Sequence, residues 1–161
     1  MLGRTVDTIR KIDESLDRKI SKKRFPLGIQ AMESLTSLGS IYFSLLILVF
    51  LWRFGHTDAA RLLGISYLAA WMPVYSLKHL VKRERPENHI GHLIGRTSFP
   101  SGHSATAFTS AILLSDLYGR ETVFISLAAT VAFSRIYLED HYLSDVITGS
   151  LIGIAVGLLI V

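Results

Sequence analysis

The sequence predicts an all-α integral membrane protein, a bundle of about five transmembrane helices preceded by an N-terminal amphipathic helix in the membrane interface. Half of the 161 residues are hydrophobic, and the mean hydropathy is +0.40, which is high for a soluble domain of this length. The apolar residues gather in five stretches, with no internal repeat and no Pro/Ser-rich linker between them. We therefore expect residues 1–161 to form one membrane domain.

The first predicted element is an amphipathic helix over residues 5–24. Its apolar side chains recur at spacings of three and four, which places them on one helical face: Val6, Ile9, Ile12, Leu16 and Ile20. Basic and acidic residues are interleaved over the rest of the segment, a pattern typical of a helix in the membrane interface. The alternative is a charged, solvated helix packed against the rest of the protein. A secretory signal peptide is not expected, since no uninterrupted apolar core follows the first charges.

The five apolar stretches predict the membrane-spanning helices. Their expected bounds are residues 27–54, 60–82, 101–118, 122–138 and 142–161. Each apolar core is shorter than the ~20 residues that cross the hydrocarbon layer, but polar ends such as Lys78 can snorkel to complete the span. Pro73 is expected to kink the second helix. Glycines at every fourth position of the fifth helix, Gly149, Gly153 and Gly157, predict close packing against a neighbour.

The charge balance indicates an anionic partner. The net charge is +4, and such a balance suits nucleic acid, lipid headgroups or a phosphorylated substrate. Nucleic acid is disfavoured because binding it requires an exposed, soluble basic surface. With five spans, residues 82–99 and 134–145 fall on the same side of the membrane as the N-terminus. We expect the chemistry on this side, because ionisable residues in an apolar bundle need a functional reason. The absence of cysteine excludes disulfides and thiolate metal sites.

Cations near the end of the second span indicate a phosphate site. Lys78 and Arg85 are seven residues apart, close to two helical turns, so they point the same way if the helix continues to the proline after Arg85. Arg135 would add a third cation and a bidentate fork for phosphate oxygens. The alternative for the run Lys82, Arg83 and Arg85 is plain contact with lipid headgroups.

The start of the third span is expected to bind phosphate as well. Ser101 is a good N-cap, Gly102 lets the backbone approach a ligand closely, and the free N–H groups of a first helical turn attract anions. Ser101 beside His103 also suits a serine hydrolase, but the sequence contains no Gly-x-Ser-x-Gly elbow.

A histidine and a carboxylate complete the candidate site. His141 and Asp145 have i, i+4 spacing, so the carboxylate can bond one imidazole nitrogen and leave the other free to attack. The same spacing also fits an ordinary structural contact. A metal site formed by His103, His141 and Asp145 is disfavoured because the nearby cations would repel a divalent ion.

Taken together, three segments resemble the three-part signature of the type 2 phosphatidic acid phosphatase family. The segments are Lys78-x6-Arg85-Pro86, Pro100-Ser101-Gly102-His103 and Ser134-Arg135-x5-His141-x3-Asp145. All signature positions are present in the right order and at the right internal spacings, and they cover residues 78–145. The family shares its site with vanadium-dependent haloperoxidases.

The resemblance implies a role for each site residue. His141 would be the nucleophile that forms a phosphohistidine, Asp145 would orient it, and His103 would be the general acid. The phosphoryl oxygens would be bound by Lys78, Arg85, Ser101, Gly102 and Arg135. No metal or other cofactor is implied, because the cations do the work that a magnesium ion does elsewhere.

The implied function is hydrolysis of a phosphomonoester or diphosphate on a membrane lipid. Candidate substrates are lipid A 1-phosphate, undecaprenyl diphosphate, phosphatidylglycerophosphate and phosphatidic acid, and the loop over residues 87–99, with His89, His92 and Arg96, is expected to shape the choice of headgroup. The alternatives are a vanadate-dependent oxidoreductase, a class whose members are soluble, and a non-catalytic anion-binding membrane protein, which needs neither an acid nor a nucleophile.

The resemblance also implies a location. The family places its active site on the periplasmic or outer face of the bacterial inner membrane. The positive-inside rule alone would put the basic N-terminus, and the site with it, in the cytoplasm. We follow the family, because catalysis and an interfacial helix that carries its own acids account for many of these charges.

Overall fold

The structure is a computed structural model that describes residues 2–90 and 97–161, and within them it is helical. The elements are α1 (Leu2–Ser21), α2 (Pro26–Thr36), the 3-10 turn η1 (Ser37–Gly39), α3 (Ile41–Arg53), α4 (Thr57–Val81), α5 (Gly102–Tyr118), α6 (Glu121–Tyr137) and α7 (Leu143–Ile160). The predicted all-α class is confirmed. His92 and Arg96, expected to shape headgroup choice, lie outside the described residues.

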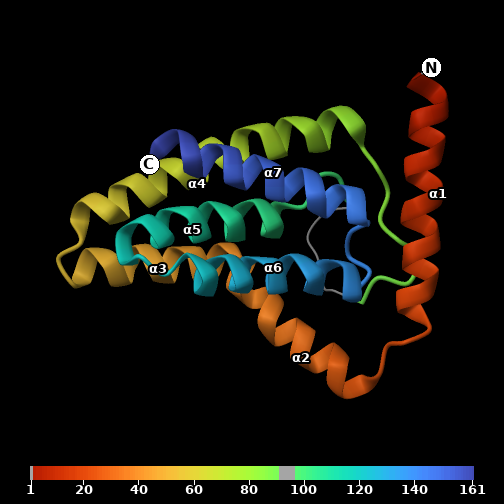
Figure 1. The fold of residues 1–161 in the computed structure, drawn as a ribbon, viewed down its shortest axis with the longest axis horizontal. Coiled ribbons are helices and arrows are strands. Elements are labelled where there is room, and N and C mark those ends of the chain that lie inside the picture. Colours follow the sequence, from red (N-terminus) through yellow and green to blue (C-terminus); the bar gives the residue numbers. More distant parts are fainter. Residues whose placement is uncertain (1, 91–96) are drawn as a thin grey trace.

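The helices form a bundle with α1 across one end (Figure 1). Helices α3 to α7 run lengthwise beside one another, and α5 packs against α4, α6 and α7. The α4–α5 and α6–α7 connections lie at the end of the bundle where α1 stands. Residues far apart in the sequence therefore meet at this end.

The glycine row of α7 lets it approach α5 closely, as its spacing predicts. A Cβ atom at Gly149 would collide with the carbonyl oxygen of Ser101, and one at Gly153 would collide with that of Ala105. At Gly157 the nearest atoms belong to Ile112. This contact fixes the start of α5 against α7, where the candidate site lies.

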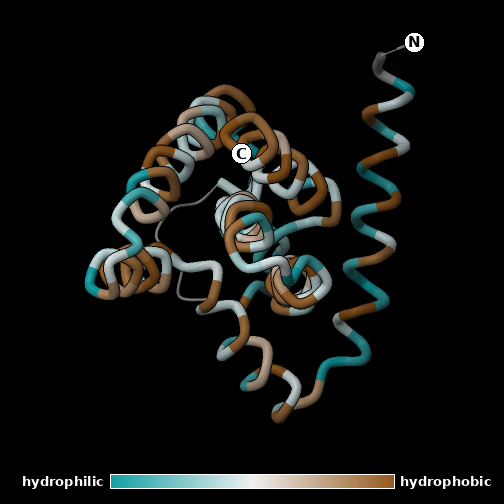
Figure 2. The backbone as a smooth tube through the Cα atoms, turned by 60° about the vertical axis from the view of Figure 1, so that its left-hand side comes forward, coloured by the Kyte–Doolittle hydropathy of each residue, from teal (hydrophilic) through white to brown (hydrophobic). Residues whose placement is uncertain are grey.

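The outer surface of the bundle is apolar. Large hydrophobic side chains on α3, α4 and α7 face outward, among them Leu46, Leu68, Met72 and Leu159. Figure 2 shows the hydrophobic residues along the bundle helices and the alternation of hydrophilic and hydrophobic residues along α1. An exposed apolar surface of this extent suits lipid rather than water.

The predicted first span, residues 27–54, is formed by two helical segments rather than one. The chain bends by 51° between the α2–η1 segment and α3. Ser40 is extended at the bend, and its side chain caps α3 by accepting a hydrogen bond from the Phe43 N–H at 3.2 Å. Gly39 packs closely against Val131 and the backbone of His103. Ser40 therefore ends one helix and begins the next.

Length and apolarity support fewer spans than five within the described residues. Helix α7, with a mean hydropathy of 2.0, is long and apolar enough to cross a membrane, and the bent α2–α3 segment passes the same test if it is taken as one span. The helices predicted over residues 60–82, 101–118, 122–138 and 142–161 are present as α4 to α7. The count of five spans remains a prediction.

Helix α1 packs against the bundle through its second half. Leu16 and Ile20, in its second half, pack against a buried cluster formed by α6 and α7. In its first half, Val6, Ile9 and Ile12 are exposed. The predicted apolar face is therefore only partly packed against the rest of the protein, and the place of this helix in the membrane interface remains a prediction.

Candidate active site

The candidate site lies at the end of the bundle that α1 crosses. Lys78 is in the last turns of α4, Ser101 and His103 are at the start of α5, Arg135 is near the end of α6, and Asp145 is in the first turn of α7. His103 lies within electrostatic range of other site side chains, namely Arg135, His141, Arg85 and Lys78. The fold thus brings together the predicted residues of three separate segments.

Arg85 reaches the site by a different route from the predicted one. The alignment of Lys78 with Arg85 on one helical face required α4 to continue to the proline after Arg85, but α4 ends at Val81 because Lys82 takes a left-handed conformation with φ 48°. The chain then turns back and forms an isolated antiparallel bridge between Glu84 and Thr97. Lys78 supports this turn, since its Nζ donates a hydrogen bond to the carbonyl oxygen of Thr97 at 3.1 Å.

From this loop, Arg85 lies beside His141. Its Nη1 donates a hydrogen bond to the carbonyl oxygen of Asp140 at 2.6 Å and lies 3.4 Å from Nε2 of His141. A guanidinium is thus held next to the imidazole nitrogen that faces away from Asp145.

His141 sits in the turn between α6 and α7 rather than on a helix. Helix α7 begins at Leu143 with Tyr142 as its N-cap, so the i, i+4 spacing of His141 and Asp145 does not lie within one helix. The two residues are nevertheless close, with Nδ1 of His141 3.8 Å from Oδ2 of Asp145. That distance is too long for a hydrogen bond and makes the contact electrostatic.

Burial sets the protonation of His141. The side chain is 3% exposed, and burial lowers the pKa of His141 to about 3, against the opposing effect of the Asp145 carboxylate; Arg135 and Arg85 lower it further. The imidazole is therefore neutral near neutral pH, and one ring nitrogen carries a free lone pair.

Arg135 is held by two partners that the sequence did not indicate. Its Nη2 lies 2.8 Å from Oδ2 of Asp140, and its Nη1 donates to Oγ1 of Thr36 at 2.7 Å. Thr36 lies at the end of α2, just before the bend, so the bent segment helps to place this arginine. Arg135 is itself almost fully buried.

Ser101 is the N-cap of α5, as predicted. Its Oγ accepts hydrogen bonds from the N–H of Ser104 at 3.3 Å and from the hydroxyl of Ser104 at 2.9 Å. Its own N–H donates to the carbonyl oxygen of Asp145 at 3.0 Å. These contacts tie the start of α5, including Gly102, to the first turn of α7.

Two site-adjacent residues, Asp13 and Arg83, were not assigned any role at the site from the sequence. Arg83 is not a plain headgroup contact, because its Nη2 donates to Asp13 and its Nη1 to Asp145, each at 2.8 Å. One signal could have found Asp13. It lies four residues after Ile9 and three before Leu16, so it is a charged residue on the apolar face of α1.

A second contact ties the chain after α1 to the α6–α7 turn. Nη2 of Arg24 lies 3.0 Å from Oε1 of Glu139, a fully buried residue with a left-handed φ of 55°. Burial raises the pKa of Glu139, and the nearby Asp17 raises it further. Within the part of the chain that the structure describes, no three His, Asp or Glu side chains are grouped to hold a metal ion.

Comparisons with known proteins identify the family of the chain. Residues 59–161 match the family model described as PAP2 superfamily. The fold is similar to the crystal structure of Aquifex aeolicus LpxE, with a TM-score of 0.82, 31% identity, and coverage of 92% of this chain and 94% of that chain.

Two further similarities are more limited. The crystal structure of the first transmembrane PAP2 type phosphatidylglycerolphosphate phosphatase from Bacillus subtilis gives a TM-score of 0.86, with coverage of 95% of this chain and 84% of that one, but at 23% identity it shows the fold alone. A lipid A 1-phosphatase from Porphyromonas gingivalis is 46% identical over 65 residues, which are 37% of this chain and 15% of that protein. The family model, the likeness to LpxE and the apolar outer surface show that this chain is a membrane protein and belongs to the PAP2 superfamily.

Proposed function

We propose that the chain is an integral membrane phosphatase that removes phosphate from a lipid, with His141 as the nucleophile. One observation carries this proposal. His141 lies between a carboxylate and a cation, with Nδ1 3.8 Å from Asp145 and Nε2 3.4 Å from Nη1 of Arg85. A neutral imidazole with its proton on Nδ1, toward Asp145, presents the Nε2 lone pair to a phosphoryl group bound by Arg85.

In the first step, Nε2 of His141 forms a bond to phosphorus and the bond between phosphorus and the lipid oxygen breaks. The electron pair of the broken bond stays on the lipid oxygen, which takes a proton from the imidazolium form of His103, a form that the negative charge of the bound phosphate favours. Positive charge develops on the imidazole of the phosphohistidine, and the Asp145 carboxylate stabilises it. The 3.8 Å gap to Asp145 would shorten as this charge forms, as catalytic hydrogen bonds often do.

In the second step, water attacks the phosphohistidine. His103, now neutral, takes a proton from the water as its oxygen bonds to phosphorus. The phosphorus–nitrogen bond breaks, its electron pair returns to Nε2, and phosphate leaves. Lys78, Arg85 and Arg135, with Ser101 and the Gly102 amide, stabilise the phosphoryl oxygens in both steps.

The proposed substrate stays in the membrane while it reacts. We propose that α3 to α7 provide the spans, the first completed by the bent α2, and that α1 lies in the interface with Val6, Ile9 and Ile12 toward lipid. An acyl chain can then remain beside the apolar surface of the bundle while its headgroup meets the site. The similarity to a protein named lipid A 1-phosphatase supports a phosphorylated lipid as substrate.

We further propose the bacterial inner membrane, with the site facing the periplasm. Because the chain has no cysteine, a single introduced cysteine is the one thiol of this chain that can be labelled in intact cells. Glu87→Cys, on the site side, should react with an impermeant maleimide added from outside, and Arg120→Cys, in the α5–α6 turn, should react only after the cells are opened. The reverse pattern would overturn the orientation and leave the chemistry untouched.

The experiment that tests the function is phosphate release by purified protein from a panel of lipid A 1-phosphate, undecaprenyl diphosphate, phosphatidylglycerophosphate and phosphatidic acid, with EDTA present. Wild type should release phosphate from at least one lipid, and His141→Ala should not. Release from none of the lipids, or release that survives His141→Ala, would sink the proposal. Loss of wild-type activity in EDTA would point to a metal instead.

A further inference from the structure

Arg83 joins three parts of the chain that meet beside the candidate site. It lies in the loop after α4; its Nη1 donates to Oγ of Ser144 at 2.7 Å and to Oδ1 of Asp145 at 2.8 Å, and its Nη2 donates to Oδ2 of Asp13 at 2.8 Å. Its guanidinium carbon also lies 4.0 Å from the centre of the Tyr142 ring. One side chain thus connects α1, the α4–α5 loop and the first turn of α7.

Asp13 completes this arrangement from the side of α1. Its Oδ1 accepts a hydrogen bond from the N–H of Ser144 at 3.0 Å, and its Oδ2 accepts one from the Ser144 hydroxyl at 2.5 Å as well as from Arg83. The side chain is 2% exposed. A buried carboxylate is costly unless it is paired and hydrogen-bonded, so the folded state retains Asp13 through this set of contacts.

We propose that Arg83 and Asp13 are positioning residues that hold the Asp145 carboxylate in line with His141, so that docking of α1 supports the reaction. This inference rests on the roles proposed above for His141 and Asp145. It assigns to the pair no contact with the substrate.

The two oxygens of Asp145 have separate partners. Oδ1 is held by Arg83, while Oδ2 accepts the N–H of Tyr142 at 3.0 Å and faces Nδ1 of His141. With both oxygens fixed, the carboxylate cannot rotate away from the imidazole. Without Arg83, Oδ1 of Asp145 would lose this hydrogen bond and the carboxylate could rotate. Oδ2 would then face Nδ1 of His141 in a smaller fraction of the molecules.

Arginine suits this position better than lysine. Nη1 and Nη2 bind two different carboxylates while the planar group stacks on Tyr142. A lysine carries the same charge but cannot span both acids and stack at once. The charge of Arg83 also offsets the repulsion between the carboxylates of Asp13 and Asp145.

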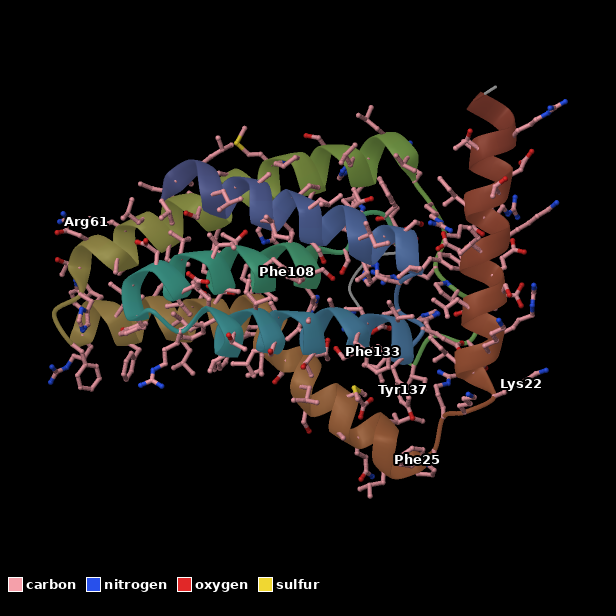
Figure 3. The ribbon with its side chains drawn as sticks, in the orientation of Figure 1. Lys22, Phe25, Arg61, Phe108, Phe133 and Tyr137 are labelled. Carbon is pink, nitrogen blue, oxygen red and sulfur yellow. The ribbon has the colours of Figure 1, made fainter. Side chains whose placement is uncertain are left out.

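The test uses variants of this pair and of a matched pair far from the site. Arg61 and Asp58 also form an Arg–Asp contact, at 3.3 Å, but both are exposed, and Figure 3 shows Arg61 at the end of the bundle opposite α1. The variants are Asp13→Asn, Arg83→Lys and Arg83→Ala, and the controls are Asp58→Asn, Arg61→Lys and Arg61→Ala. Each is purified in detergent, and kcat and KM are measured on the lipid that wild type hydrolyses best.

We expect kcat to fall about 10- to 100-fold in Asp13→Asn and Arg83→Ala, with KM within about twofold of wild type because the phosphate-binding residues remain. Arg83→Lys should restore part of kcat. The controls should keep wild-type kcat and KM. The melting temperature of each variant is measured in the same detergent. The kcat assays are then run at a temperature well below the lowest melting temperature, so that unfolding of a variant is not mistaken for a lower kcat.

Three results would overturn the inference: kcat within twofold of wild type in folded Asp13→Asn and Arg83→Lys; a raised KM with unchanged kcat, which would make Arg83 a headgroup contact; or equal losses in the Arg61 and Asp58 controls. If Arg83→Ala does not fold, Asp13→Asn and Arg83→Lys decide the question, since they keep the size of the side chains. Activity that survives His141→Ala would instead refute the proposed function, so the two failures are distinguishable.

Discussion

The two ends of the bundle each hold an Arg–Asp pair, in opposite settings. At the α1 end, Arg135 and Asp140 are 2.8 Å apart with side chains 2% and 1% exposed; at the other end, Arg61 and Asp58 are 3.3 Å apart with side chains 77% and 89% exposed. An exposed pair contributes little to stability, and a buried pair is costly to desolvate. The burial of charge at the α1 end is therefore not explained by stability alone, and it fits a site that holds phosphate.

The turns at the two ends differ in the same sense. At the far end, the left-handed residues are glycines, Gly55 with φ 86° and Gly119 with φ 63°. At the α1 end they are Lys82 and Glu139, for which this conformation costs about 1 kcal/mol each. Backbone strain of this kind clusters at functional sites. Here the strained residues lie in the loop that contains Arg85 and in the turn that contains His141.

The largest expected difference between the ends is in catalysis. His141→Ala should lower kcat by at least about 10³-fold, because it removes the nucleophile, whereas Asp58→Ala should stay within twofold of wild type. Both are measured as phosphate release from the preferred lipid. Comparable losses in the two variants would mean that the ends do not differ in function.

The second largest expected difference between the two ion pairs is in their contribution to stability. Asp140→Ala leaves Arg135 buried without its carboxylate and should reduce the free energy of unfolding by about 3–5 kcal/mol, while Asp58→Ala should change it by less than about 1 kcal/mol. Thermal unfolding in one detergent, with both variants beside wild type, measures the difference. Equal melting temperatures would show that burial of the Arg135–Asp140 pair has no energetic consequence.

The effect of a cation on phosphate binding should be smaller. Arg85→Ala should reduce kcat/KM about 10²-fold and weaken competitive inhibition by inorganic phosphate, because one charged donor to the phosphoryl oxygens is lost. Arg61→Ala removes the same charge at the far end and should change neither quantity. Unaltered phosphate inhibition in Arg85→Ala would remove Arg85 from the phosphate site.

The smallest expected signal is the absence of a titration. Burial lowers the pKa of His141 to about 3, so the imidazole should stay neutral between pH 7.5 and 5, where an ordinary histidine gains a proton. The measurement is NMR of histidine labelled in its ring, with His141→Gln to assign the resonance. A His141 signal that moves with a midpoint near pH 6.5 would show that the ring is not buried as described.

The sequence predicted the helices better than their ends. Long apolar stretches are enough to locate α3 to α7, and the glycine row correctly indicated close packing of α7. The turn after α4 was missed because Lys82 has no feature that favours a left-handed conformation; the turn depends on contacts with residues that follow later, such as Thr97. The bend at Ser40 was missed although a serine after a glycine is a reasonable N-cap.

For the site, too, the sequence predicted local features better than contacts between distant segments. The residues proposed to bind phosphate and to catalyse the reaction follow from three local motifs, each readable within a short segment. The residues that hold them do not, because their partners are distant in sequence: Arg83 and Asp13 are 70 residues apart, and Arg135 and Thr36 are 99 apart. Charged residues on an apolar face, such as Asp13, are the signal to look for when the fold is not yet known.

The most direct test of the account is a search for the phosphohistidine at His141. Wild-type protein is mixed with lipid carrying a labelled phosphate, quenched within milliseconds in alkaline denaturant, digested and analysed by mass spectrometry. The account predicts an acid-labile phosphate on the peptide that contains His141, absent from His141→Ala. An acid-stable phosphate on Ser101, a labelled peptide that persists in His141→Ala, or turnover of the lipid with no labelled protein would contradict it.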